Sequence, residues 1–206
     1  MPLLVYCALL QDVTTELPTH GVRSADVHAV RTGRLIALYS EMEQSSIAAD
    51  SFKDSALEFH HVVHSVFARS AVIPFRFPTW LSKAELIAHL EDKSVRYESF
   101  LRDHAAHVQM ELRVEQTHAG VSHAASGTEH LRARAAQLGE LEKKTSELKR
   151  VLAPQVLEWR ERDTAEGKRL FALVERDRVP DFRQKLGGIK VQVSGPWPAT
   201  EFFALE

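Results

Sequence analysis

The chain has 206 residues, enough for one large or two small domains with a well-buried core. Hydrophobic residues make up 44% and charged residues 26%, as in ordinary globular proteins, and the net charge of −2 gives no basic excess for nucleic acid or an anionic membrane. The single cysteine, Cys7, excludes an intrachain disulfide and fits a reducing cytoplasm.

The first apolar run, LLVYCALL from Leu3 to Leu10, is too short to span a bilayer. No basic segment precedes it and no small-residue cleavage site follows in the right place, which argues against a signal peptide. We interpret the run as a strand buried on both faces, with Cys7 as a small core residue.

The spacing of apolar residues changes along the next elements. Two apolar segments flank Thr32-Gly33, which predicts a hairpin from about Asp26 to Ser40. Apolar residues at helical spacing predict a helix from Phe52 to Ala68. In SAVIPFRFPTW, apolar residues on both sides of Pro74 indicate a strand over 71–77 with the proline at an edge or a bulge.

The middle of the chain begins with a capping box. Ser82 and Glu85 form the S-x-x-E pattern and predict a helix to about His104. The stretch VQMELRVEQ alternates strictly between apolar and polar residues, which predicts a half-buried strand over 108–116.

A second capping box, Ser126 and Glu129, opens the longest predicted helical segment, which extends to about Arg162. Its leucines recur at steps of three, four and seven, which favours a helical hairpin arm or a short coiled-coil seam. Pro154 is expected to kink or interrupt it. The leucines expected to be buried against the 83–104 helix or a second protomer are Leu138, Leu141, Leu148 and Leu152.

Residues 71–116 and 168–195 both have the order strand, helix, strand, and two such units in one sheet make the split βαβ, or ferredoxin-like, arrangement. The predicted fold class is therefore α+β. A small N-terminal α+β lobe (1–70) precedes a ferredoxin-like domain (71–206) with a helical insertion at about 120–165. One antiparallel sheet is expected from 71–77, 108–116, 168–175 and 189–195, with helices near 83–104 and 179–187 on one face.

A catalytic motif is not found, since phosphate-binding loops, nucleophile elbows and C-x-x-C pairs are all missing from the sequence. His60 and His64 lie four residues apart on one predicted helix face and could grip a metal ion, although no third ligand is identified. A solvated helix face explains them better. We assign no catalytic, cofactor-binding or metal-binding residue and expect no enzyme, and keep a ferredoxin-like metal-dependent or ligand-binding domain using His60 and His64 as the alternative function.

The tail, SGPWPATEFF, is unusually aromatic. Pro196 and Pro198 hold the backbone extended. Trp197 is then either a latch, buried against the body of the protein, or an exposed anchor for a partner. For an isolated tryptophan we favour the latch. Some residues are not explained by ordinary core packing, and we take them as candidates for partner binding. They are Arg76, Trp80, Trp197, Phe202 and Phe203.

Three segments, HHVVHSVFARSAVIPFRFPTWLS, VQMELRV and SGPWP, in this order resemble the gas vesicle accessory proteins of the F and L type. The resemblance covers essentially the whole chain, and Ser194–Pro198 is its most specific part. The chain departs from the usual family pattern at Pro78, where glycine is common, and after Pro198. The residues of the middle segment that match the family pattern are His61, Pro74, Arg76, Phe77 and Thr79.

The resemblance implies a non-enzymatic, cytoplasmic protein that helps to assemble gas vesicles, as a chaperone-like factor or a minor shell component. Its implied partner is the small hydrophobic shell protein, with other gas vesicle accessory proteins as further candidates. We expect no cofactor, nucleic acid or membrane partner. Self-association through the 126–162 helix is a further expectation.

Overall fold

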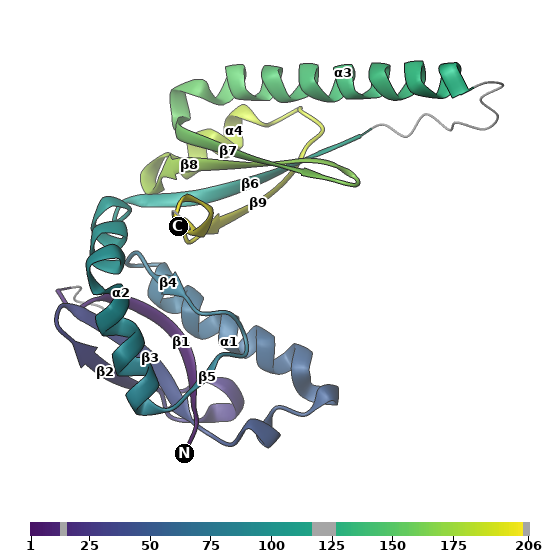
Figure 1. Ribbon diagram of the computed structural model, residues 1–206. Helices are drawn as coiled ribbons and strands as arrows, with labels where there is room; N and C mark the ends of the chain where they lie inside the picture. The colour runs from purple at the N-terminus through teal and green to yellow at the C-terminus, as the bar shows by residue number, and fades with distance from the viewer. Residues whose placement is uncertain (13–15, 117–126, 204–206) are drawn as a thin grey trace. The chain divides into compact units, whose positions relative to one another are not determined.

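The computed structural model describes residues 1–12, 16–116 and 127–203, and the chain divides into two compact units, Met1–Ala106 and His107–Glu206 (Figure 1). Each unit combines helices with an antiparallel sheet of its own, so the α+β prediction is confirmed. The predicted boundary at residue 70 is wrong, because residues 71–106 belong to the first unit. Among the described residues, no helix is both long and apolar enough to cross a membrane.

The first sheet is built around strand β1, which lies between β3 and the two short strands β4 and β5. Its order is β2-β3-β1-β4, and β5 also pairs with β1. The predicted hairpin is confirmed, with Gly33 at φ 56° in its turn. The strands are β1 (Leu3–Leu10), β2 (His28–Thr32), β3 (Leu35–Glu41), β4 (Ile73–Pro74) and β5 (Trp80–Leu81).

Helices α1 (Phe52–Phe67) and α2 (Lys83–Asp103) both pack on this sheet (Figure 1). All eight residues of β1 are buried, so both faces of the strand are covered, as the continuous apolar run predicted. Cys7 is fully buried, and burial raises the pKa of its thiol to about 12. The thiol is therefore a core group and not a reactive one.

The capping box at the start of α2 is confirmed. The Glu85 amide donates to Ser82 Oγ at 3.2 Å, and the Ser82 amide donates to Glu85 Oε2 at 2.7 Å. Two amides that the helix leaves without intrahelical partners are thereby satisfied.

The expected sheet of 71–77, 108–116, 168–175 and 189–195 is wrong. Residues 71–77 contain only the two-residue strand β4, and β4 pairs with β1 through Cys7↔Pro74 and Ala8↔Ile73. Pro74 lacks an amide donor, so this segment contributes little pairing and serves as an edge. It completes the first sheet and not the second.

The second unit contains a four-stranded antiparallel sheet in the order β7-β8-β6-β9. Its elements follow one another as strand, helix, strand, strand, helix, strand. Helix α3 contacts β6, β8 and α4, so one face of the sheet is covered by helices (Figure 1). The elements are β6 (His107–Glu115), α3 (Gly127–Leu152), β7 (Val156–Thr164), β8 (Gly167–Glu175), α4 (Val179–Lys185) and β9 (Gln192–Trp197).

The single helix predicted to Arg162 is wrong in its last third. Helix α3 ends at Leu152, a short turn contains Pro154, and strand β7 then pairs along β8. The interruption expected at Pro154 is therefore a complete change of element. The start of the predicted segment, including Ser126, lies outside the described residues.

The leucines of α3 are only partly buried. Leu141, Leu148 and Leu152 are buried, whereas Leu138 is 50% exposed. The elements that α3 packs against are β6, β8 and α4, so the expected cover, the 83–104 helix, is wrong. The leucine seam is the ordinary apolar stripe of a helix on a sheet over its C-terminal half.

Candidate partner-binding surfaces

A row of aromatic rings runs from the core of the first unit to its surface. The Tyr6 ring lies 5.1 Å from that of Phe59, which lies 5.1 Å from Phe77, which lies 5.2 Å from Phe52. Phe52 is 46% exposed, although most large apolar side chains of this unit are buried. We call Phe59, Phe77 and Phe52, in this order from the core to the surface, the aromatic row.

The connection between β4 and β5 carries Phe77 and is fixed to β1 by its backbone. The Phe75 amide donates to the Tyr6 carbonyl at 2.9 Å, and the Val5 amide donates to the Thr79 carbonyl at 3.1 Å. The Thr79 hydroxyl closes the turn by donating to the Arg76 carbonyl at 2.5 Å. The sequence PFRFPT is therefore a rigid turn, a suitable base for binding residues.

Arg76 and Trp80 lie on this same connection. The Arg76 side chain is exposed at the turn, and Trp80 is half-buried in β5, opposite Leu4 of β1. The structure thus brings these two sequence-predicted residues onto one segment beside the aromatic row. Phe52 was missed, because a single phenylalanine at a helix start gives no signal until Phe77 is placed beside it.

A second aromatic group lies between this connection and α2. The Phe75 ring lies 5.5 Å from His89, and His89 Nε2 is 2.8 Å from the Tyr97 hydroxyl. Burial, with a smaller contribution from nearby Lys93, lowers the pKa of His89. Burial likewise raises the pKa of Tyr97. The pair is a hydrogen-bonded contact within α2, and its His89 ring packs against Phe75 of the connection.

The C-terminal tail packs on the second sheet. Phe202 is buried, whereas Trp197 in β9 and Phe203 are half-buried. Arg160 places its guanidinium 5.4 Å from the Phe202 ring centroid and donates to the Glu201 carbonyl at 2.7 Å. Phe202 is therefore a packing residue of this unit and not an exposed anchor.

Trp197 is half-buried, between the buried latch and the exposed anchor that the sequence left open. Trp197 donates from Nε1 to Ser194 Oγ at 3.3 Å within its own strand. The tail is also held at Glu201, whose amide donates to Gln109 Oε1 at 3.0 Å and whose carboxylate accepts from Arg162 at 2.7 Å. Sequence analysis missed Glu201, because its partners are about 40 and 90 residues away and no local pattern indicates them.

His60 and His64 lie side by side on the exposed face of α1, with ring centroids 5.7 Å apart. Burial, then the neighbouring His64 and His61, lowers the pKa of His60. In the part of the chain that the structure describes, no group of three or more histidine, cysteine, aspartate or glutamate side chains is placed to hold a metal ion. The pair can supply two ligands, and the described residues place no third ligand beside it for the metal-dependent alternative.

The family model for the gas vesicle synthesis proteins GvpL/GvpF matches residues 2–204, and the chain belongs to this family. It is therefore a gas vesicle-related protein. A comparison with curated protein sequences gives no match.

Two solved structures share the fold. The gas vesicle protein GvpF from Anabaena sp. PCC7120 aligns with a TM-score of 0.76 at 15% identity, over 100% of this chain and 96% of its own. GvpF from Microcystis aeruginosa aligns with a TM-score of 0.78 at 14% identity, over 100% of this chain and 99% of its own. At this identity the likeness concerns the fold alone.

Proposed function

We propose that the protein is a non-enzymatic gas vesicle assembly factor that binds the small hydrophobic shell protein, either as a chaperone-like factor or as a minor shell component. Family membership supports the process. The observation that carries the binding role is the aromatic row, which ends at the half-exposed Phe52.

The hydrophobic character of the shell protein is the reason for such a factor. A subunit with an exposed apolar face aggregates before assembly unless a partner covers that face. Aromatic side chains on a rigid base are effective anchors, because they bury a large area and lose little conformational entropy. Phe52 and Phe77 supply such anchors, and the exposed Arg76 stands beside them as a polar rim.

The test is co-purification of the chain with a tagged shell protein from the same genome. The Phe52→Ser variant removes the exposed end of the aromatic row and should retain less than about a tenth of the bound shell protein, as expected for an interface hot spot. Val95→Ser is the matched control, because Val95 on α2 is 83% exposed and lies outside the row. Equal retention by the wild type and Phe52→Ser, both folded by circular dichroism, would reject the aromatic row.

Four finer expectations remain part of the proposal. The second unit is ferredoxin-like, supported by its strand order β7-β8-β6-β9 and its β-α-β-β-α-β element order. The protein acts in the cytoplasm at the gas vesicle, and other gas vesicle accessory proteins are further partners.

Self-association through α3 is the fourth expectation. Leu131 and Leu138 lie seven residues apart on one helix face and are 67% and 50% exposed. Sedimentation velocity should show an oligomer in the wild type that the Leu131→Gln/Leu138→Gln variant loses, and a monomeric wild type would reject this part.

A further inference from the structure

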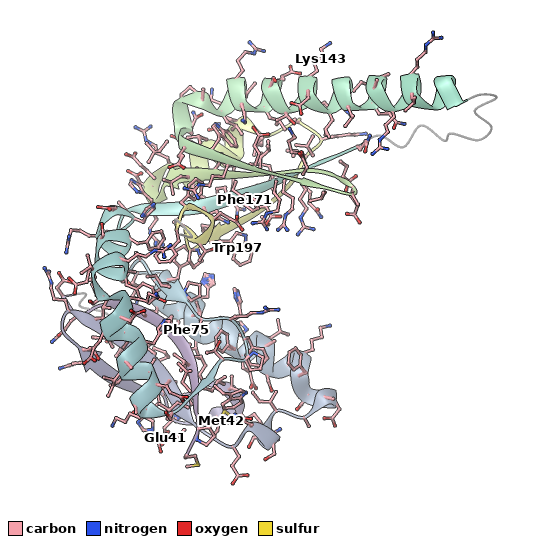
Figure 2. The ribbon with its side chains drawn as sticks, viewed as in Figure 1. Glu41, Met42, Phe75, Lys143, Phe171 and Trp197 are labelled. Carbon is pink, nitrogen blue, oxygen red and sulfur yellow. The ribbon has the colours of Figure 1, made fainter. Side chains whose placement is uncertain are left out.

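The second sheet has one face that α3 and α4 do not cover. Strand register separates the two faces, because Lys168 bonds to Glu142 of α3 and so points to the helices, whereas the next residue, Arg169, points away. Pairs across the strands place further side chains on the same uncovered face as Arg169 (Figure 2, where Phe171 is labelled). These pairs are Arg113↔Arg169, Glu111↔Phe171, Arg160↔Phe171 and Arg162↔Arg169. We call this surface the arginine face.

Guanidinium groups form the outer layer of this face over Phe171. Arg162 and Arg169 lie over the Phe171 ring at 5.6 and 5.4 Å from its centroid, and Phe171 is only 2% exposed. Binding of single-stranded nucleic acid on a sheet requires exposed rings on which bases stack. The arginine face offers planar donors instead, which suit carboxylates.

One end of the arginine face already holds a peptide segment. Arg162 binds the Glu201 carboxylate, Arg160 binds the Glu201 carbonyl, and the next residue, Phe202, is buried below Arg160. A carboxylate followed by an aromatic residue is thus the chemistry that this face accepts from its own chain.

At the other end of the arginine face, an exposed arginine shares its carboxylate partner with a second arginine. Arg113 Nε and Arg169 Nη2 bind the same oxygen of Glu111, at 2.9 and 2.7 Å, so two guanidinium groups share one carboxylate. Glu111 is 9% exposed in its side chain, whereas Arg113 is 53% exposed. Arg113 therefore turns unused donors toward solvent.

An open pocket of about 210 Å³ lies at this end and is lined by Arg113, Arg169 and Gln192. Glu115 and Glu166 also line it, so it suits a single carboxylate better than a polyanion. We propose that Arg113, Arg169 and Gln192 form a docking site for an acidic side chain on a peptide segment of a protein partner. This site is separate from the aromatic row and does not depend on the proposed function.

The test uses the full chain and a fluorescein-labelled probe peptide, acetyl-Ala-Glu-Phe-Phe-Ala-amide, measured by fluorescence anisotropy in low salt. Arg113→Gln should weaken binding about tenfold, the effect of losing one charge-assisted contact. Glu111 keeps Arg169 in this variant, so the fold is retained. Arg134→Gln is the control, because it makes the same charge change on an exposed position of α3 and should leave the affinity unchanged.

Three further measurements decide the outcome. A probe with glutamine in place of glutamate should also bind about tenfold more weakly, since the carboxylate is the recognised group. Arg162→Gln should not weaken binding; if it abolishes binding while Arg113→Gln does not, the probe displaces the tail and the proposal is overturned. It is also overturned if a single-stranded RNA oligonucleotide binds more tightly than the peptide with the same dependence on Arg113.

Discussion

The two sheets of this protein differ in how many faces are covered, and the central strands record the difference. In the first sheet every residue of β1 is buried. In the second, Leu112 of β6 is fully buried on the helix-covered face, and its neighbour Arg113 is 53% exposed in its side chain on the other. A continuous apolar strand thus indicates two apolar faces and an alternating strand indicates one. On the polar face of β6, Gln109 and Glu111 are buried by contacts with the tail and with arginines, whereas Arg113 is exposed.

The same difference decides where each unit can bind. The first unit has no free sheet face along β1, so its exposed aromatic side chains lie at the edge, on the β4–β5 connection and the start of α1. The second sheet has a face without helices, on which its own tail and a layer of arginines lie. The two units therefore offer binding surfaces of different chemistry, because both faces of β1 are covered in the first sheet, whereas helices cover only one face of the second sheet.

The largest expected effect concerns the burial of the central strands β1 and β6. Leu3→Ala and Leu4→Ala, adjacent in β1, should each lower the free energy of unfolding by roughly 3 kcal/mol, as truncation of buried leucines does. In β6, Leu112→Ala should cost about as much, whereas Arg113→Ala should change stability by less than about 1 kcal/mol. Urea unfolding of the four variants measures this, and equal costs at Leu112 and Arg113 would contradict a one-sided second sheet.

The next effect concerns the tail. Phe202→Ala should lower stability by about 2 kcal/mol, below the usual value for a core phenylalanine because the tail can retreat when the ring is lost. Phe203→Ala and Trp197→Ala, both at half-buried positions, should cost less. Hydrogen–deuterium exchange by mass spectrometry should show the Phe202→Ala loss as faster exchange in β6 and β7, and faster exchange confined to the tail would show that it does not stabilise the sheet.

On the helix-covered face, Lys168 links α3 to the sheet. Its side chain is 9% exposed and binds Glu142 at 2.6 Å and Glu161 at 3.0 Å, and the hydrogen bond to Glu142 is the main cause of its raised pKa. Lys168→Gln should cost roughly 1–2 kcal/mol in low salt, because hydrogen bonds between charged groups are lost. A raised lysine pKa stabilises the fold below the unfolded pKa, so the wild type should lose this contribution at strongly alkaline pH, and Lys168→Gln should not. Thermal melts across the alkaline range test both statements.

The smallest expected effect is the pH dependence of the first unit. His89 has a lowered pKa in the fold, so the unfolded chain binds its proton more readily and stability falls as the pH drops below about 6.5. His89→Gln keeps a partner for Tyr97 and should flatten the dependence of the melting temperature between neutral and mildly acid pH. An unchanged slope would show that other groups cause it.

Much of the fold could be predicted from local pattern. The strand Leu3–Leu10, the hairpin around Gly33, the capping box at Ser82 and the alternating strand β6 all have signals that depend on neighbouring residues. Where pairing over long distance decides, prediction failed. The segment 71–77 pairs with β1 over only two residues, and nothing local says to which sheet they belong.

The prediction of strand β7 failed for another reason, since its residues were predicted to be helical. Its residues, VLEWRERDT, include leucine, glutamate and arginine, which favour helices, and the leucine spacing continued across Pro154. Pairing with β8 over the whole strand overrides this preference. Of the candidate site, Arg76 and Trp80 could be selected from sequence, whereas Phe52 and Glu201 gain their meaning only from contacts made by the fold.

The most direct test of the account is hydrogen–deuterium exchange of the full chain with and without the shell protein from the same genome. We expect slower exchange on binding in peptides covering 52–59 and 73–81, which carry the aromatic row and the β4–β5 connection. We expect little change in β6, β8 and the tail. Protection confined to the second unit, with 52–59 and 73–81 unchanged, would contradict it.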